Sequence, residues 1–320
     1  MNDIAATGRM KRIGLFDSGV GGLSILRYLE KMAASLELPV KFVYFADTAR
    51  CPYGNRSAED ISRFVEEIVS FLDSSCVDEI VMACNTSAAV AARRAHEISS
   101  VPVHDLIKPT ANFVANKFKR VGVIATSTTC QKRAFSSAIA QVNPDCQVLE
   151  IPAPDLVPLV ESGKLDGQEV EATIQKYVDQ LKAFNADSLI FGCTHFPFLE
   201  NAFKKLLPRV SFVDPAVHLG KELLGGGTAA SNSATAQNLN FKRHVYFTTG
   251  SADAFSTAAE QCLGLDSGTL SDSICAMALE QIESFQIEPI TEVSKTGSHA
   301  VPLDQALSAT QLPSAAPTGF

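Results

Sequence analysis

Two cysteines constrain this chain most, because each follows an apolar segment that predicts a buried strand. Cys84 comes directly after residues 80–83 and precedes small polar residues and an alanine-rich run that predicts a helix. Ligands of open α/β sheets bind at this position, at the carboxyl end of a strand. The unpaired N–H groups and the dipole at a helix start stabilise an anion there, and a thiolate is one such anion.

The second cysteine repeats this setting. Residues 188–191 predict another apolar strand, which Gly192 separates from Cys193. A lone cysteine at a strand end is more often a buried structural residue than a catalytic one. Two such thiols in two similar halves of the chain favour one site that both halves share.

Polar residues follow other predicted strands in the same way. Asp17 comes after residues 12–16 and opens a glycine-rich turn, and Asp47 comes after residues 40–46. Asp17 is either a helix cap or a partner for a substrate ammonium group or a thiol proton. Together with Cys84, these two carboxylates place polar side chains at three consecutive strand ends, which indicates a site. In the second half, residues 126–130 supply hydroxyl groups after a strand, where they can cap a helix or donate to a carboxylate.

Composition limits the class of protein. With 320 residues, 46% hydrophobic and 19% charged, the chain is long enough for two globular domains. No apolar run is long enough to span a membrane, and residues 1–11 lack the apolar core of a signal peptide, so we expect a cytoplasmic protein without a membrane partner. The net charge of −8 and the lack of a basic stripe argue against nucleic acid as the main partner.

The cysteines exclude several kinds of chemistry. The eight cysteines form no CxxC pair, and Cys193 with His195 is the only close Cys/His pair, so we expect reduced thiols and no metal site. The Cys-x5-Arg loop of a phosphatase is absent, since Val90 stands at that place after Cys84. A cysteine hydrolase would use His195 beside Cys193 but would leave Cys84 without a task. Two thiols at one cleft can instead remove a proton from one face of a carbon atom and deliver one to the other face, at a reference pKa of about 8.5.

The order of strands and helices predicts an α/β protein of two similar domains with parallel-rich sheets and the active site in the cleft between them. We expect the first domain to comprise residues 12–107 and 217–286, and the second to comprise residues 108–216. The termini, 1–11 and 288–320, and the stretch 225–240 predict flexible segments.

The chain resembles glutamate racemases of the cofactor-independent Asp/Glu racemase superfamily. Its matching motifs run in order along nearly the whole predicted ordered chain and are together highly specific. They are GLFDSGVGGL at 14–23, DTAR at 47–50, PYG at 52–54, CNT at 84–86, GCTH at 192–195 and TTG at 248–250.

The resemblance implies roles for individual residues. Cys84 and Cys193 would be the two acid/base thiols, which Asp17 and His195 would assist, with Asp47 and Glu161 as supporting carboxylates. The residues that would bind substrate are Asp17, Ser18, Pro52, Tyr53, Gly54, Asn85, Thr86, Thr126, Thr129, Thr194 and His195. The resemblance also implies glutamate as substrate, no cofactor, a supply of D-glutamate for peptidoglycan, and a possible homodimer.

Two departures and two alternatives accompany this interpretation. Phe196 stands where the family usually has tyrosine, and Lys108 stands where an acidic or neutral residue is expected. A racemase of the same superfamily that acts on aspartate or a related acid is the first alternative. The second is a glutamate-binding regulator without catalysis, against which the two retained thiols argue.

Overall fold

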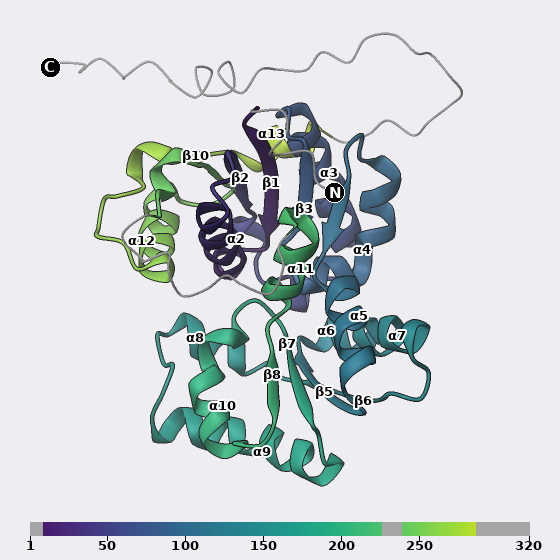
Figure 1. Cartoon of the computed structure of the whole chain (residues 1–320). Coiled ribbons are helices and arrows are strands. Elements are labelled where there is room, and N and C mark those ends of the chain that lie inside the picture. The colour runs from purple at the N-terminus through teal and green to yellow at the C-terminus, as the bar shows by residue number, and fades with distance from the viewer. Residues whose placement is uncertain (1–8, 226–238, 286–320) are drawn as a thin grey trace, which may run out of the picture.

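The computed structural model describes residues 9–225 and 239–285, and these residues form two α/β units stacked one above the other (Figure 1). The predicted tail at 288–320 and most of the predicted flexible stretch 225–240 lie outside the described residues. Among the described residues, no helix is both long and apolar enough to cross a membrane.

The upper unit in Figure 1 is built on a six-stranded sheet in the order β10-β9-β2-β1-β3-β4, and every pair in it is parallel. Its strands are β1 (Lys11–Asp17), β2 (Val40–Ala46), β3 (Glu79–Met82), β4 (Val103–Asp105), β9 (Val245–Thr248) and β10 (Ile274–Ala276). Buried apolar side chains on both faces of β1 and β2 explain why these strands lack an alternating pattern.

Helices cover both faces of this sheet. One core packs α2, α11 and α12 against it, and α3, α4 and α13 pack on the opposite face. Their bounds are α2 (Leu23–Ser35), α3 (Ala58–Ser74), α4 (Asn85–Ile98), α11 (Pro215–Leu224), α12 (Ala252–Leu263) and α13 (Leu279–Glu283). Ser57 caps α3 by accepting a hydrogen bond from the backbone N–H of Asp60.

The lower unit holds a parallel four-stranded sheet in the order β6-β5-β7-β8. Its strands are β5 (Arg120–Ala125), β6 (Gln147–Pro152), β7 (Ser188–Gly192) and β8 (Ser211–Val213). Its helices are α5 (Ile107–Lys117), α6 (Ser127–Gln131), α7 (Ala134–Val142), α8 (Leu156–Glu161), α9 (Gln168–Phe184) and α10 (Glu200–Leu206).

The two sheets repeat one topology. In each, the first strand lies between the second and the third, and the fourth lies outside the third, which gives the orders β2-β1-β3-β4 and β6-β5-β7-β8. Cys84 and Cys193 follow the third strand of their respective sheets. The predicted likeness of the two halves is therefore confirmed at the level of fold.

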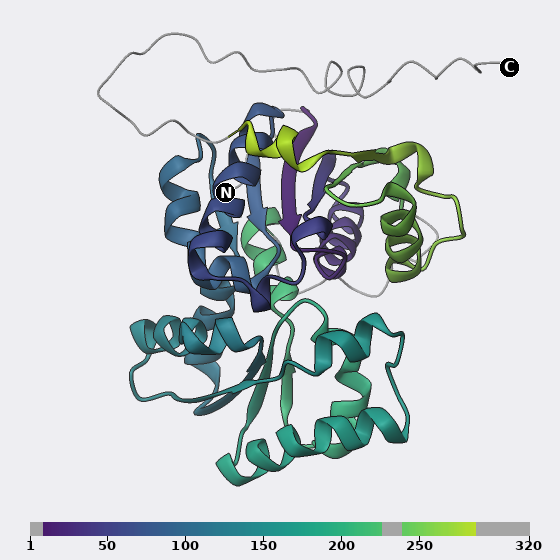
Figure 2. The same cartoon turned by 180° about the vertical axis from the view of Figure 1, so that it is seen from behind.

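The chain passes to the lower unit through α5 and comes back to the upper unit through α11 (Figures 1 and 2). It then adds β9 and β10 to the first sheet. The predicted domain borders at 107/108 and 216/217 fall just inside these two helices, and their positions stay a prediction. Strand β10 was not predicted from sequence, because it is three residues long, lies at the sheet edge and is only partly buried.

The end of β7 requires glycine. A Cβ atom at Gly192 would lie 2.9 Å from the Cβ atom of Ala125, 3.0 Å from the ring of Phe135 and 3.1 Å from the carbonyl oxygen of Ile124. Because one of these neighbours is backbone, the strand would have to move away from β5 to accept a side chain.

We therefore expect Gly192→Ala to lower the free energy of unfolding by about 1–3 kcal/mol, as measured by urea denaturation. Ser137→Ala, at an exposed position of α7, is the control and should change stability by less than about 0.5 kcal/mol. Equal stability of the Gly192→Ala protein and the wild type would show that this junction is not tightly packed.

Candidate active site

The two cysteines meet in one small pocket between the sheets. Cys84 is 6% exposed and is the N-cap residue of α4, and Cys193 is 7% exposed and follows β7 directly. The carboxyl ends of strands from both sheets therefore supply the pocket. The two settings differ in one respect that the sequence did not predict: Cys193 leads into the 3-10 turn η3 (Phe196–Leu199) rather than an α-helix.

Eleven of the predicted site residues line this pocket. They are Ser18, Pro52, Tyr53, Gly54, Cys84, Asn85, Thr86, Thr126, Cys193, Thr194 and His195. Cys51 and Val157 also line it, although neither was assigned a role from sequence. The sequence places Cys51 in the loop after Asp47, beside the PYG motif and near the predicted site, whereas Val157 is an apolar residue of α8 without any motif.

Four predicted residues lie outside the lining. Asp17 is buried behind it and is reached by the Thr194 hydroxyl group at 3.4 Å, and Thr129 is buried beside Thr126, with 2.9 Å between their hydroxyl oxygens. Glu161 is half exposed at the end of α8 and borders a neighbouring cavity. Asp47 is fully buried, and its oxygens accept hydrogen bonds from other side chains of the protein.

Hydrogen bonds between the two units hold the pocket closed. The hydroxyl oxygens of Thr86 and Thr126 lie 2.9 Å apart, the Thr128 hydroxyl donates to the carbonyl of Gly54 at 3.0 Å, and the Ser24 hydroxyl donates to the carbonyl of Thr194 at 3.2 Å. The pocket that remains has a volume of about 30 Å³. That volume holds about one or two water molecules and no amino acid.

Cys193 belongs to a chain of three titratable groups. Its sulfur lies 3.8 Å from Nδ1 of His195, and Nε2 of the same ring lies 3.5 Å from Oε1 of Glu161. Burial lowers the pKa of His195, but the contacts with Cys193, Glu161 and Asp17 outweigh burial and raise this pKa to about 10. The imidazole is therefore protonated near neutral pH and can donate a hydrogen bond to the sulfur.

Cys84 has a different environment. Burial, followed by the nearby Asp17 carboxylate, raises the pKa of its thiol to about 12. The sequence-based expectation that the helix start would lower this pKa is wrong for the structure as it stands, because burial and the Asp17 charge outweigh the hydrogen bonds that Ser87 supplies. Cys84 is therefore a neutral thiol near neutral pH.

Asp17 links the two cysteine environments. Burial raises the pKa of its carboxyl group, while the positive charge of His195 and a hydrogen bond from the N–H of Gly19 oppose that rise. The same carboxylate thus faces Cys84 on one side and Thr194 and His195 on the other. A cation that entered the pocket would interact favourably with it.

Two buried polar atoms in the pocket lining lack a hydrogen-bond partner among the described residues. They are Oδ1 of Asn85 and Nε2 of His195. His195 Nε2 lies 3.5 Å from Glu161, but the two groups form an ion pair and not an aligned hydrogen bond. Buried polar groups are rarely left unpaired, so these two atoms are available for hydrogen bonds to a polar ligand. No group of three potential metal-ligating side chains occurs in the described parts of the chain.

Two parallel α/β units place Cys84 and Cys193, after equivalent strands, in one closed pocket, and this arrangement is typical of an acid–base enzyme rather than a structural module. Comparison with known proteins places this enzyme among racemases. The family model described as Asp/Glu/Hydantoin racemase matches residues 13–220.

Relatives of known name agree with that match. The chain is 40% identical to a glutamate racemase of Desulforudis audaxviator over 79% of this chain and 93% of the relative, and 44% identical to one of Trichodesmium erythraeum over 67% and 78%. A crystal structure of glutamate racemase from Francisella tularensis in complex with D-glutamate superposes with a TM-score of 0.72 at 31% identity, covering 85% of this chain and 99% of that one. The chain belongs to the Asp/Glu/Hydantoin racemase family.

The departures from the family pattern lie away from the pocket lining. Phe196 is fully buried in the core of the lower unit, and Lys108 is exposed on α5 with its amino group 4.0 Å from Asp105. Neither side chain lines the pocket between the cysteines.

The raised pKa of His195 predicts a pH-dependent contribution to stability. The folded-state value of about 10 exceeds the unfolded reference of about 6.5, so this contribution is complete below about pH 6.5 and is lost as the pH rises through 10. We expect the stability difference between wild type and His195→Gln in urea denaturation to shrink between pH 6.5 and 10.

His96→Gln is the control. Burial and neighbouring cations lower the pKa of this imidazole, so the His96→Gln difference should not follow the same trend. A His195→Gln difference that stayed constant with pH would show that His195 is not held as a cation.

Proposed function

We propose that this protein interconverts L- and D-glutamate by transferring the α-proton between two thiols. The observation that carries the proposal is the placement of Cys84 and Cys193 after equivalent strands of two sheets, in one pocket. The names of the relatives and the resemblance of the motifs support glutamate as the substrate.

The proton balance requires one thiolate and one thiol. The thiolate on one side removes the α-proton, so that the C–H bond breaks and an S–H bond forms. The thiol on the other side gives its proton to the opposite face of the same carbon, and the two sulfurs exchange protonation states. The neutral thiol of Cys84 suits the donor role, and the protonated His195 stabilises negative charge on Cys193.

The pocket lining, together with the Asp17 carboxylate behind it, supports a zwitterionic substrate. The first backbone N–H groups of α4 and the hydroxyl of Thr86 suit a carboxylate, because a helix start carries partial positive charge. The free Oδ1 of Asn85 and the carboxylate of Asp17 suit the α-ammonium group. A substrate ammonium beside Asp17 would offset the charge that raises the pKa of Cys84, so binding would bring this thiol closer to its working range.

Substrate entry requires the two units to separate. The closed pocket of about 30 Å³ cannot admit glutamate, and hydrogen bonds between the units close it, among them those of Thr86 with Thr126, Thr128 with Gly54 and Ser24 with Thr194. We infer an opening motion about α5 and α11, where the chain crosses between the units, followed by closure that excludes water from the reacting carbon.

Three further features extend this proposal. D-glutamate from this reaction would serve peptidoglycan synthesis, the enzyme would act in the cytoplasm, and two copies would form a homodimer. Sedimentation velocity measures the oligomeric state, and a monomer at micromolar concentration would exclude a stable dimer.

The deciding experiment follows L- and D-glutamate separately in D2O, by circular dichroism and proton NMR, without added cofactor. Two-thiol transfer predicts that early product carries deuterium at the α-carbon while unreacted substrate keeps protium, because each isomer meets a different thiol. Binding of glutamate without exchange would favour a regulator, and turnover of aspartate alone would keep the chemistry and change the substrate.

Cysteine variants test the mechanism itself. Cys84→Ser and Cys193→Ser should each lower kcat/KM by at least about 10²-fold, because a serine hydroxyl is a far weaker acid than a thiol. Cys146→Ser, at a cysteine outside the pocket lining, is the matched control and should keep wild-type activity. Substantial activity in either pocket variant would contradict the two-thiol scheme.

A further inference from the structure

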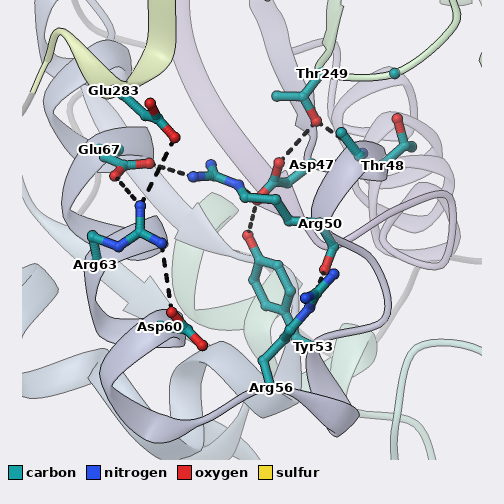
Figure 3. A network of polar contacts seen from close by, with 12 residues as sticks. Asp47, Thr48, Arg50, Tyr53, Arg56, Asp60, Arg63, Glu67, Thr249 and Glu283 are labelled. Carbon is teal, nitrogen blue, oxygen red and sulfur yellow. Dashed lines mark hydrogen bonds and ion pairs between the residues drawn. The ribbon is translucent and has the colours of Figure 1, made fainter. Parts of the chain in front are cut away.

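A buried ion network stands behind the pocket, and the proposed mechanism does not account for most of it. The network begins at Tyr53, which lines the pocket and whose hydroxyl donates to Oδ2 of Asp47 (Figure 3). The other carboxylate oxygen, Oδ1, accepts a hydrogen bond of 2.8 Å from Thr249. Asp47 is thus fully engaged by the protein and holds the phenol ring in place.

Arg50 extends the network away from the pocket. Its Nε donates to Oδ2 of Asp47 at 2.7 Å, its Nη1 donates to Glu67 on α3, and its guanidinium carbon lies 4.1 Å from the centre of the Phe64 ring. Nη2 has no partner among the described residues. The orientation of the guanidinium therefore depends on two carboxylates and one aromatic face.

Glu67 anchors this chain of contacts to the scaffold. Its side chain is fully buried, its Oε2 accepts from Arg50, and its Oε1 accepts from Arg63 at 3.1 Å. Arg63 in turn lies 3.9 Å from Glu283 on α13. The charges alternate along the network, so that each buried charge has an opposite neighbour.

We propose that Glu67, acting through Arg50 and Asp47, is a positioning residue that fixes Tyr53 and its turn against the substrate. This inference deepens the proposed function and depends on it for its kinetic readout. In a pocket of about 30 Å³, a small shift of the ring changes the space left for the reacting carbon. A misplacement of about 1 Å can cost about 10²-fold in rate.

A double-mutant cycle tests whether Glu67 acts through Tyr53. Glu67→Gln keeps the shape of the side chain but removes the charge, and we expect it to lower kcat/KM about tenfold in the wild-type background. In the Tyr53→Phe background, which lacks the hydroxyl that Asp47 holds, the same change should alter kcat/KM less than about twofold. The proposal would be overturned if the effects of Glu67→Gln and Tyr53→Phe on kcat/KM were additive. It would also be overturned if either single variant had wild-type kinetics.

Two further variants separate positioning from stability. Glu66→Gln removes the neighbouring carboxylate of α3, which pairs with Arg94 at 2.8 Å on the surface, and it should keep wild-type kcat/KM. Glu67→Asp withdraws the carboxylate from Arg50 by one methylene group. Because this variant keeps the buried negative charge, it should still fold if Glu67→Gln does not. An unchanged kcat/KM in the folded Glu67→Asp protein would contradict the positioning role.

A spectroscopic readout stands apart from activity. The chain has five tyrosines, so protein labelled with 13C at the tyrosine ζ carbon gives a few signals, and the one lost in Tyr53→Phe belongs to Tyr53. That signal should shift in Glu67→Gln and stay fixed in Glu66→Gln. If wild type does not turn over glutamate, the proposed function fails, while this shift still decides whether Glu67 fixes the Tyr53 hydroxyl.

Discussion

Parallel pairing of apolar strands is the constraint on which the rest of this structure depends. Strands that are buried on both faces cannot carry polar side chains along their length, so polar groups collect where each strand ends. Because all strands of a parallel sheet end at the same edge, Asp17 and Cys84 come together although they are distant in sequence. The second sheet brings Thr126 and Cys193 together by the same rule.

The pairing of two such sheets gives the two thiols different surroundings. Cys84 faces a buried carboxylate and stays neutral, whereas Cys193 faces a protonated imidazole. A reaction that passes a proton from one face of a carbon to the other needs one donor and one acceptor at any moment. The asymmetry of charge around two equivalent positions is thus suited to the proposed chemistry.

The C-terminal part of the chain ties the first sheet to the site. Strand β9 adds itself beside β2, and Thr249 at its end reaches Asp47, which in turn holds Tyr53. The C-terminal part of the fold is therefore linked to the pocket wall at Tyr53 through the buried carboxylate of Asp47. This arrangement explains how residues far from the proton transfer can affect the shape of the pocket.

Local sequence determined much of this protein. Apolar runs of strand length with polar residues after them predicted the strands that carry Asp17, Asp47, Cys84 and Cys193, because burial and strand length are properties of a short segment. The motifs around these residues predicted most of the pocket lining. Only the tertiary structure decided the pKa of Cys84 and the hydrogen bond between Asp47 and Arg50. It also decided that Val157 lines the pocket and that Glu67 pairs with Arg50. These depend on burial and on charges brought close from distant segments, which no local pattern encodes.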